Sequence, residues 1–218
     1  MVPDCHRRTT PTSTETPLLG LVVEGQADFY AIPVLLETAG IRHAKPFVLH
    51  GQAVNCDVRK LVELRIARVV QIAVLKQVSQ VLVIIDRENR TQCPGAFAQE
   101  VERHINAVMT SNYAYGGSPP IRVVCADRKL ENWLIADPEG LHTHNYVVRD
   151  LSRKVGANAD AKDGVALLKW AYRPGRYYHK TRDAPSLAAK VNVTDSSVRR
   201  RSHSLDKLLR ECGVAPLC

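Results

Sequence analysis

Apolar residues along this chain fall into short unbroken runs and into longer stretches with helical spacing. Unbroken runs at residues 18–23 and 81–85 predict strands, the first of them buried on both faces, and residues 47–50 and 121–125 predict two more. Glu24 and Gly25 end the first run, and Asp86 directly follows the run at 81–85. Strands of this kind belong in the middle of a covered sheet.

Stretches with helical spacing follow each of these runs. The predicted helices span residues 27–39, 58–78, 94–108 and 129–136, with Pro33 as a point where the first could kink or start late. A strand followed by a helix, repeated four times, predicts an α/β fold. We expect a mostly parallel sheet of about four strands with helices on both faces.

Beyond Pro138 the apolar pattern weakens. Further helices are predicted at 164–172, 185–191 and 204–211, separated by polar and basic loops. The expected organisation is a flexible tail at 1–17, an α/β domain at 18–137 and a basic helical extension at 138–218. The extension has too few apolar residues for a core of its own, so we expect it to pack against the same core.

Charge is unevenly distributed over the 218 residues, whose formal net charge is +8. Residues 1–150 contain 16 Lys and Arg against 16 Asp and Glu, whereas residues 151–218 contain 14 against 6. A basic surface of this kind attracts polyanions such as nucleic acid. The pattern is equally compatible with a solvated basic face that binds nothing.

Other features of the composition bear on location. No apolar run approaches the roughly 20 residues that a membrane-spanning helix needs, and the first residues lack the apolar stretch of a secretory signal. The six cysteines form no Cys-x-x-Cys pair, which suits reduced thiols. We therefore expect a cytoplasmic protein without a membrane partner.

Three acidic residues follow two of the predicted strands. Glu24 ends the first run, and Asp86 and Glu88 follow the run at 81–85. The carboxyl ends of parallel strands meet at one sheet edge, where ligands bind in open α/β folds. Clustered carboxylates repel one another unless cations neutralise them, and their hard oxygens suit Mg²⁺ or Mn²⁺. Taken alone, Glu24 also fits a capping or sugar-binding role.

The ordered combination of these motifs resembles the TOPRIM domain of topoisomerases, primases, ribonuclease M5 and OLD-family nucleases. Leu21–Gly25 is similar to the glutamate motif, and Ile84–Glu88 is similar to the Asp-x-Asp motif. The likeness covers about residues 18–137 and implies a TOPRIM or Rossmann-like sheet. Glu88 departs from the pattern, because it stands where the second aspartate is usual, and this leaves the number of metals open.

A narrower resemblance is to an uncharacterised TOPRIM-like bacterial family, often encoded near ATPases of defence systems. The similar segments are 24–28, 86–90, 130–137, 178–180 and 202–208. This resemblance implies that Glu131, before the Trp-Leu pair, is an additional active-site acid, with an exposed helix charge as the alternative. Asp127 is four residues earlier and is expected to share its helix face.

The resemblance implies a nuclease in which Glu24, Asp86 and Glu88 bind Mg²⁺ or Mn²⁺ and Glu131 completes the set of catalytic acids. Trp133 and Trp170 are candidates for stacking on bases, although Trp133 is better explained as a core residue. The side chains expected to contact DNA or RNA are Lys180, Arg182, Lys190, Arg199, Arg200 and Arg201.

Two alternatives stay open. The first is a non-catalytic partner or effector subunit, which binds an ATPase or nucleic acid without cleaving it. The chain carries no Gly-x-x-x-x-Gly-Lys-Ser/Thr motif, so any ATP-driven step needs another chain. The other alternative is a primase-like nucleotidyl transferase, which is weaker because no separate substrate-binding module is evident.

Overall fold

A computed structural model describes residues 18–49, 57–88, 90–112 and 119–217. The predicted tail at 1–17 and the end of the predicted strand at His50 lie outside these residues. The strands are β1 (Leu19–Val23), β2 (Phe47–Val48), β3 (Gln80–Asp86) and β4 (Ile121–Ala126). The helices of the first part of the chain are α1 (Gln26–Thr38), α2 (Val58–Leu61), the π-helical turn η1 (Val62–Ile66), α3 (Ala67–Val74), α4 (Pro94–Asn112) and α5 (Leu130–Leu134).

The strands form one sheet in the order β2-β1-β3-β4, with parallel pairing throughout. Val23 lies beside Ile84, and Asp86 lies beside Ala126, so the carboxyl ends of the three longer strands meet at one edge. The predicted α/β fold with a parallel sheet is confirmed.

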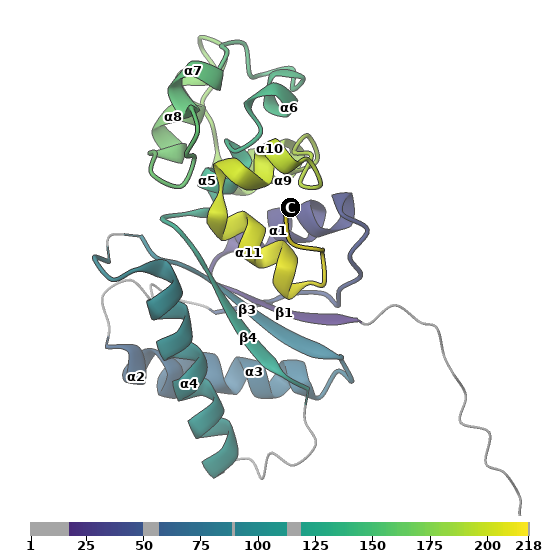
Figure 1. The fold of residues 1–218 in the computed structure, drawn as a ribbon, viewed down its shortest axis with the longest axis vertical. Coiled ribbons are helices and arrows are strands. Elements are labelled where there is room, and N and C mark those ends of the chain that lie inside the picture. Colours follow the sequence, from purple (N-terminus) through teal and green to yellow (C-terminus); the bar gives the residue numbers. More distant parts are fainter. Residues whose placement is uncertain (1–17, 50–56, 89, 113–118, 218) are drawn as a thin grey trace, which may run out of the picture.

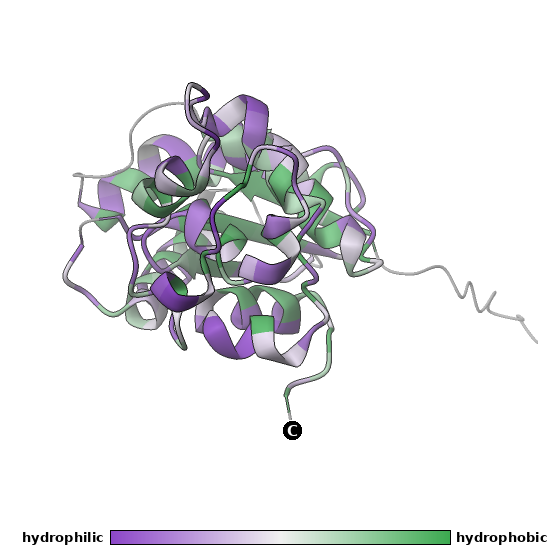
Figure 2. Cartoon of the chain, turned by 90° about the horizontal axis from the view of Figure 1, so that it is seen from above, coloured by the Kyte–Doolittle hydropathy of each residue, from purple (hydrophilic) through white to green (hydrophobic). Residues whose placement is uncertain are grey.

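Each face of the sheet supports its own apolar core, because alternate residues of a strand point to opposite faces. Leu21 and Leu82 belong to the core that contains α1, whereas Val22 and Val83 belong to the core that contains α3 and α4. Figure 1 shows α2, α3 and α4 on one side of the strands, and α1 and α11 on the other. In Figure 2, seen from above, the hydrophobic strands lie in the middle and the hydrophilic segments around them.

The C-terminal part adds α6 (Pro138–His142), α7 (Ser152–Val155), α8 (Gly164–Ala171), α9 (Lys180–Ala188), α10 (Ser196–Arg201) and α11 (His203–Glu211). Its apolar residues do not form a separate core. Leu168, Leu187 and Leu205 are fully buried in the same cluster as Leu21 of β1 and Leu82 of β3. The residues after Pro138 therefore share the core on one face of the sheet, where α11 packs on β4 and α9 packs on α1.

Several element bounds differ from the prediction. The helix predicted at 58–78 includes a π-helical turn and ends at Val74, since Gln77 takes a left-handed conformation with φ of 54°. The helix predicted at 185–191 begins earlier, at Lys180, and contains Pro185. The short helices α6, α7 and α10 were not predicted, because four to six residues are too few to show a helical period.

None of the helices in the described ranges has both the length and the apolar character that crossing a bilayer requires.

Candidate active site at the carboxyl edge of the sheet

Glu24 and Asp86 meet at the carboxyl edge of the sheet. They follow neighbouring strands, and the backbone N–H of Asp86 donates a hydrogen bond of 2.8 Å to Oε2 of Glu24. Burial raises the pKa of the Glu24 carboxyl, and the charge of Glu88 acts in the same direction. The side chain of Glu24 thus reaches toward the end of β3, as the pattern of strands predicts.

Asp28 is a further acid of this edge that the sequence reasoning missed. It lies in the first turn of α1, is 9% exposed, and accepts a hydrogen bond of 2.9 Å from the backbone N–H of Gly25. Burial, together with the charges of Glu24 and Glu131, raises the pKa of Asp28 to about 7. The Glu-Gly-x-x-Asp spacing could have identified Asp28. An acid four residues after a Glu that ends a strand lies in the first turn of the next helix, and so beside that Glu.

Glu131 comes from the first turn of α5 and is only 1% exposed. Its Oε1 accepts a hydrogen bond of 3.1 Å from the hydroxyl of Tyr178 and lies 3.4 Å from Nζ of Lys180. Both partners come from the C-terminal part of the chain. Glu131 is therefore not an exposed helix charge, and its carboxylate is held at the site by residues about fifty positions away.

Glu88 sits on a strained turn just after β3. Its φ is 50°, a region that side chains other than glycine rarely adopt, and its backbone N–H bonds at 3.0 Å to the carbonyl of Arg128, whose φ is 85°. Strained backbone of this kind is found at functional sites, where the surrounding structure holds it in place. The turn fixes Glu88 against the loop that leads into α5.

A hollow of about 290 Å³ brings these acids together. We call it the acid hollow, and its acids are Glu24, Asp28, Asp86, Glu88 and Glu131. Burial raises the pKa of Asp86 well above its ordinary value, and the charges of Asp28, Glu24 and Glu131 add to the effect. Lys180 and Thr181 also line the hollow. One lysine against five acids leaves a strong excess of negative charge.

The donors of the acid hollow fit a hard divalent cation in charge and in chemistry, since all are carboxylate oxygens. Within the described ranges, no three His, Cys, Asp or Glu side chains are gathered closely enough to hold a metal ion in the conformation seen. Lys180 pairs with Glu131 and also lies near enough to Asp28 and Asp86 to lower the pKa of both carboxyls, against the larger effect of burial. The fit to a cation is thus one of donor type and charge excess.

The cationic side chains predicted to bind nucleic acid are differently placed. Lys180 lines the acid hollow, whereas Arg182 is paired with Asp183 at 2.6 Å. Lys190 and Arg200 are exposed on α9's C-terminal side and on α10.

The other two arginines of that set hold the C-terminal helices together. Arg199, 5% exposed, is bound to Asp206 at 2.6 Å, and Arg201 lies 3.0 Å from Glu139. Neither lines the acid hollow. Asp127 is likewise engaged elsewhere, 2.5 Å from Arg87.

The two residues after Glu131 join α5 to the C-terminal part of the chain. Nδ2 of Asn132 donates to the carbonyls of Ala159 at 2.7 Å and Lys162 at 2.8 Å. Trp133 is fully buried and donates its indole N–H to Oγ of Ser204 at 2.7 Å. The segment that carries Glu131 is therefore anchored to the loop at 159–162 and to the first turn of α11, and Trp133 is a core residue, as expected.

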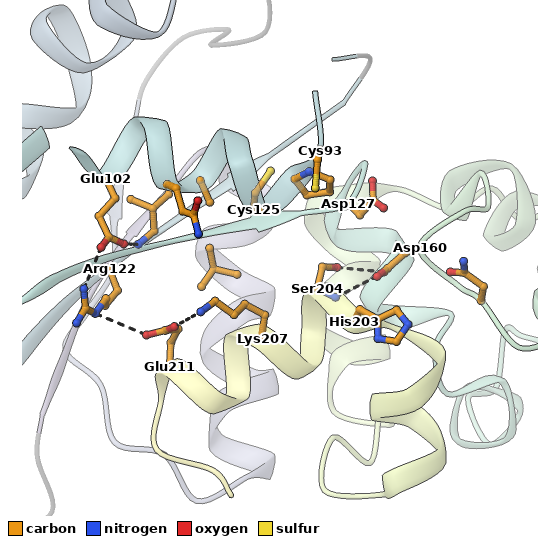
Figure 3. A pocket seen from close by; sticks show the side chains of 17 residues that line it. Cys93, Glu102, Arg122, Cys125, Asp127, Asp160, His203, Ser204, Lys207 and Glu211 are labelled. Carbon is orange, nitrogen blue, oxygen red and sulfur yellow. Dashed lines mark hydrogen bonds and ion pairs between the residues drawn. The ribbon is translucent and has the colours of Figure 1, made fainter. Parts of the chain in front are cut away.

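A larger hollow of about 590 Å³ lies between α4, β4 and α11 (Figure 3). Most of its charged side chains are satisfied by one another. Glu102 and Arg122 are 2.9 Å apart, Lys207 pairs with Glu211, and Asp160 is bound by Ser204. None of the acids of the acid hollow line it, so the larger of the two hollows is not the candidate active site.

Gly164 permits a close approach that supports the site. A Cβ atom at this first residue of α8 would lie 2.7 Å from the carbonyl carbon of Glu131 and 2.9 Å from the amide nitrogen of Asn132. We expect Gly164→Ala to push α5 away, misplace Glu131 and lower the free energy of unfolding by about 1–3 kcal/mol, as overpacking does. Urea unfolding measures the effect.

Gly95→Ala, in the first turn of α4, is the matched control for this change. The nearest atom to its added Cβ is Sγ of Cys93 at 4.0 Å, so the variant should be as stable as the parent or slightly more so. Equal stability of the Gly164→Ala and Gly95→Ala variants would contradict the tight contact between α8 and α5.

Comparison with known proteins shows the relationships of the chain. The model of a family described as "Domain of unknown function (DUF4276)" matches residues 23–211. No curated protein matches. The C-terminal region of the Xanthomonas campestris pv. campestris OLD protein is similar with a TM-score of 0.41 and 15% identity over 90% of this chain and 98% of that chain. The C-terminal region of the Burkholderia pseudomallei OLD protein has a TM-score of 0.39 and 17% identity over 91% and 99%. These structural likenesses are distant.

Proposed function

The chain belongs to the DUF4276 family, whose function is unknown, and we propose that it is a metal-dependent enzyme that cleaves phosphodiester bonds of nucleic acid. The observation that carries this proposal is the acid hollow. Five carboxylates from three segments of the chain line one hollow at the sheet edge, and the pKa values of three of them are raised by burial and by one another. Carboxylates that repel one another in this way are kept together in a fold where a bound cation neutralises them.

The residues that would hold Mg²⁺ or Mn²⁺ are Glu24, Asp28, Asp86 and Glu88. When bound, such a cation neutralises charge on a phosphate and lowers the pKa of a water nucleophile. Glu131, held by Tyr178 and Lys180, is buried and keeps a fixed position, which suits a group that orients others or accepts a proton. The wider resemblance to TOPRIM nucleases favours the same chemistry.

The direct test is incubation with plasmid DNA, single-stranded DNA and tRNA, each with Mg²⁺, Mn²⁺ or chelator. We expect cleavage of at least one substrate with metal and none with chelator. The ATPase expected from the resemblance is a proposed partner, so each reaction is repeated with the ATPase encoded nearby and with ATP. A chain that binds this ATPase but cuts nothing under any condition would instead be a non-catalytic partner.

The contribution of Asp28 to the stability of the metal-free protein is expected to be lost as pH rises from about 4 to about 7. The pKa of Asp28 is raised to about 7 in the folded chain. A carboxyl whose pKa is higher when folded binds more protons in the folded state, so its contribution to stability is fully present below its unfolded pKa and is lost as pH rises through the folded value. The loss attributable to Asp28 should be about 2–4 kcal/mol.

The measurement is the difference in unfolding free energy between the parent and Asp28→Asn at pH 5 and pH 7.5, in chelator. Taking the difference removes the opposite effect of carboxyls such as Asp183, whose pKa is lowered by Arg182 against the effect of burial. Excess Mg²⁺ should raise the unfolding free energy of the parent at pH 7.5 by binding to the folded state, and it should not raise that of the variant. If the difference between parent and variant does not change with pH, the pKa of Asp28 is not raised on folding.

A further inference from the structure

A second hollow, of about 360 Å³, adjoins the acid hollow and has the opposite charge. It is lined by the first turn of α8 and by cationic side chains from three segments of the chain. We call it the basic cleft, and its cations are Arg128, Lys129, Lys162, Lys169 and Lys180. Glu88 and Asp163 are its acids. Five cations against two carboxylates make it a place for an anion.

Most of these cations are not used by the fold. Of the five, Lys180 has Glu131 as an ion-pair partner at 3.4 Å. For the other four, no ion pair with the residues at 18–49, 57–88, 90–112 or 119–217 is found. Asp163 is occupied as the N-cap of α8, where Oδ1 accepts from the amide of Ala166 at 3.0 Å. The positive charge of the cleft is therefore available to a ligand.

The cleft is also held in shape. Asn132 binds the carbonyl of Lys162 at 2.8 Å, and Gly164 packs directly against the backbone of Glu131. Arg128 takes its left-handed conformation while its carbonyl accepts from the amide of Glu88. The same segments that place the acids thus place the backbone of the cations.

The two hollows are neighbours, because Glu88 and Lys180 line both. Lys129 also lies near enough to Glu24 to lower the pKa of that carboxyl, against the larger effect of burial. A ligand in the basic cleft would lie beside whatever occupies the acid hollow. A nucleic-acid strand carries a phosphate on every nucleotide, so it can place one phosphate in each.

We propose that the basic cleft binds a phosphate of a nucleic-acid strand next to the phosphodiester that lies at the acid hollow. This proposal rests on the proposed function, because it names a contact made by the same substrate. It makes Lys162 and Lys169 positioning residues, which hold the strand rather than take part in bond cleavage. It also assigns strand binding to α8 and the loop before it, and not to Arg199 and Arg201 of α10, which hold the C-terminal helices together.

The test is binding of a labelled single-stranded oligonucleotide and a labelled duplex in chelator, followed by fluorescence anisotropy as a function of salt. The double variant Lys162→Gln/Lys169→Gln should bind about tenfold more weakly at low salt. Its salt slope should fall by about 0.7 for the single strand, the value for one lost phosphate contact. Lys60→Gln/Lys76→Gln removes the same charge from exposed positions on the opposite face of the sheet and should change little.

The outcomes separate this proposal from the proposed function. If the variant of the cleft binds as the control does, the cleft assignment is wrong even if the parent cuts nucleic acid. If binding falls as expected but no metal supports cleavage, the cleft stands and the enzymatic proposal fails. A parent that binds no oligonucleotide overturns the cleft assignment. The assignment is also overturned if a nucleoside monophosphate, at the same concentration of nucleotides, displaces the labelled oligonucleotide as effectively as unlabelled strand does.

Discussion

Asp86→Asn should reduce metal-dependent cleavage by roughly 10³-fold, corresponding to about 4 kcal/mol of transition-state stabilisation. Asp86 ends β3 at the acid hollow, and the pKa of its carboxyl is raised by burial and by Asp28, Glu24 and Glu131. An amide has nearly the same shape but no negative charge, so the site would attract a cation less strongly. The initial rate of cleavage in saturating Mg²⁺ measures the effect.

The same variant should be more stable than the parent when metal is absent. Removing one of several mutually repelling carboxylates relieves repulsion that the folded chain otherwise bears, and functional sites commonly trade stability for activity in this way. We expect a higher Tm in chelator together with the lost activity. Asp150→Asn, at an exposed position with a local bond to the amide of Ser152, is the control and should keep full activity. An Asp86→Asn protein that cuts as fast as the parent would remove the proposed function.

The strand pattern was enough to predict the fold and the meeting of Glu24 with Asp86. Unbroken apolar runs mark strands covered on both faces, and parallel strands must end at the same edge, so an acid after each run lies near the other. Asp28 escaped the reasoning because an acid in the first turn of a helix is usually a cap. It does bind the amide of Gly25, but it also lines the acid hollow.

The contribution of the C-terminal part was harder to predict. Tyr178 and Lys180 reach Glu131 across about fifty residues of chain, and no periodicity reports which loop meets which. Net charge was a poor guide in particular. Arg199 contributes to the basic excess, yet its guanidinium is buried against Asp206 and the carbonyl of Ala215. Apart from Lys180, the cations of the basic cleft come from 128–129 and 162–169, and Arg128 and Lys129 belong to residues 1–150, which have no net charge.

Asp160→Ala should lower the free energy of unfolding by about 3 kcal/mol or more. Asp160 is 5% exposed and accepts hydrogen bonds from Oγ of Ser202 at 2.6 Å and from both Oγ and the amide of Ser204, each at 3.0 Å. Removing the carboxylate takes the acceptor away from three buried hydrogen-bond donors, and an unsatisfied buried group costs about 1–3 kcal/mol. Ser204 also receives the indole N–H of Trp133, so the loss reaches the segment that carries Glu131.

This variant also tests whether residues 138–217 fold together with the sheet. Leu168, Leu187 and Leu205 share one core with β1 and β3, so loosening the Asp160 network should lower the Tm of a single transition by about 6–12 °C, at roughly 2–4 °C per kcal/mol for a chain of this size. Calorimetry with Asp195→Ala as control fits the purpose. Asp195 caps α10 at an exposed position, where its loss costs about 1 kcal/mol. Two separate transitions in Asp160→Ala would mean that the extension is an independent unit. The acid hollow would then depend on docking between two bodies, because Tyr178 and Lys180 belong to the extension and Glu131 to the sheet domain.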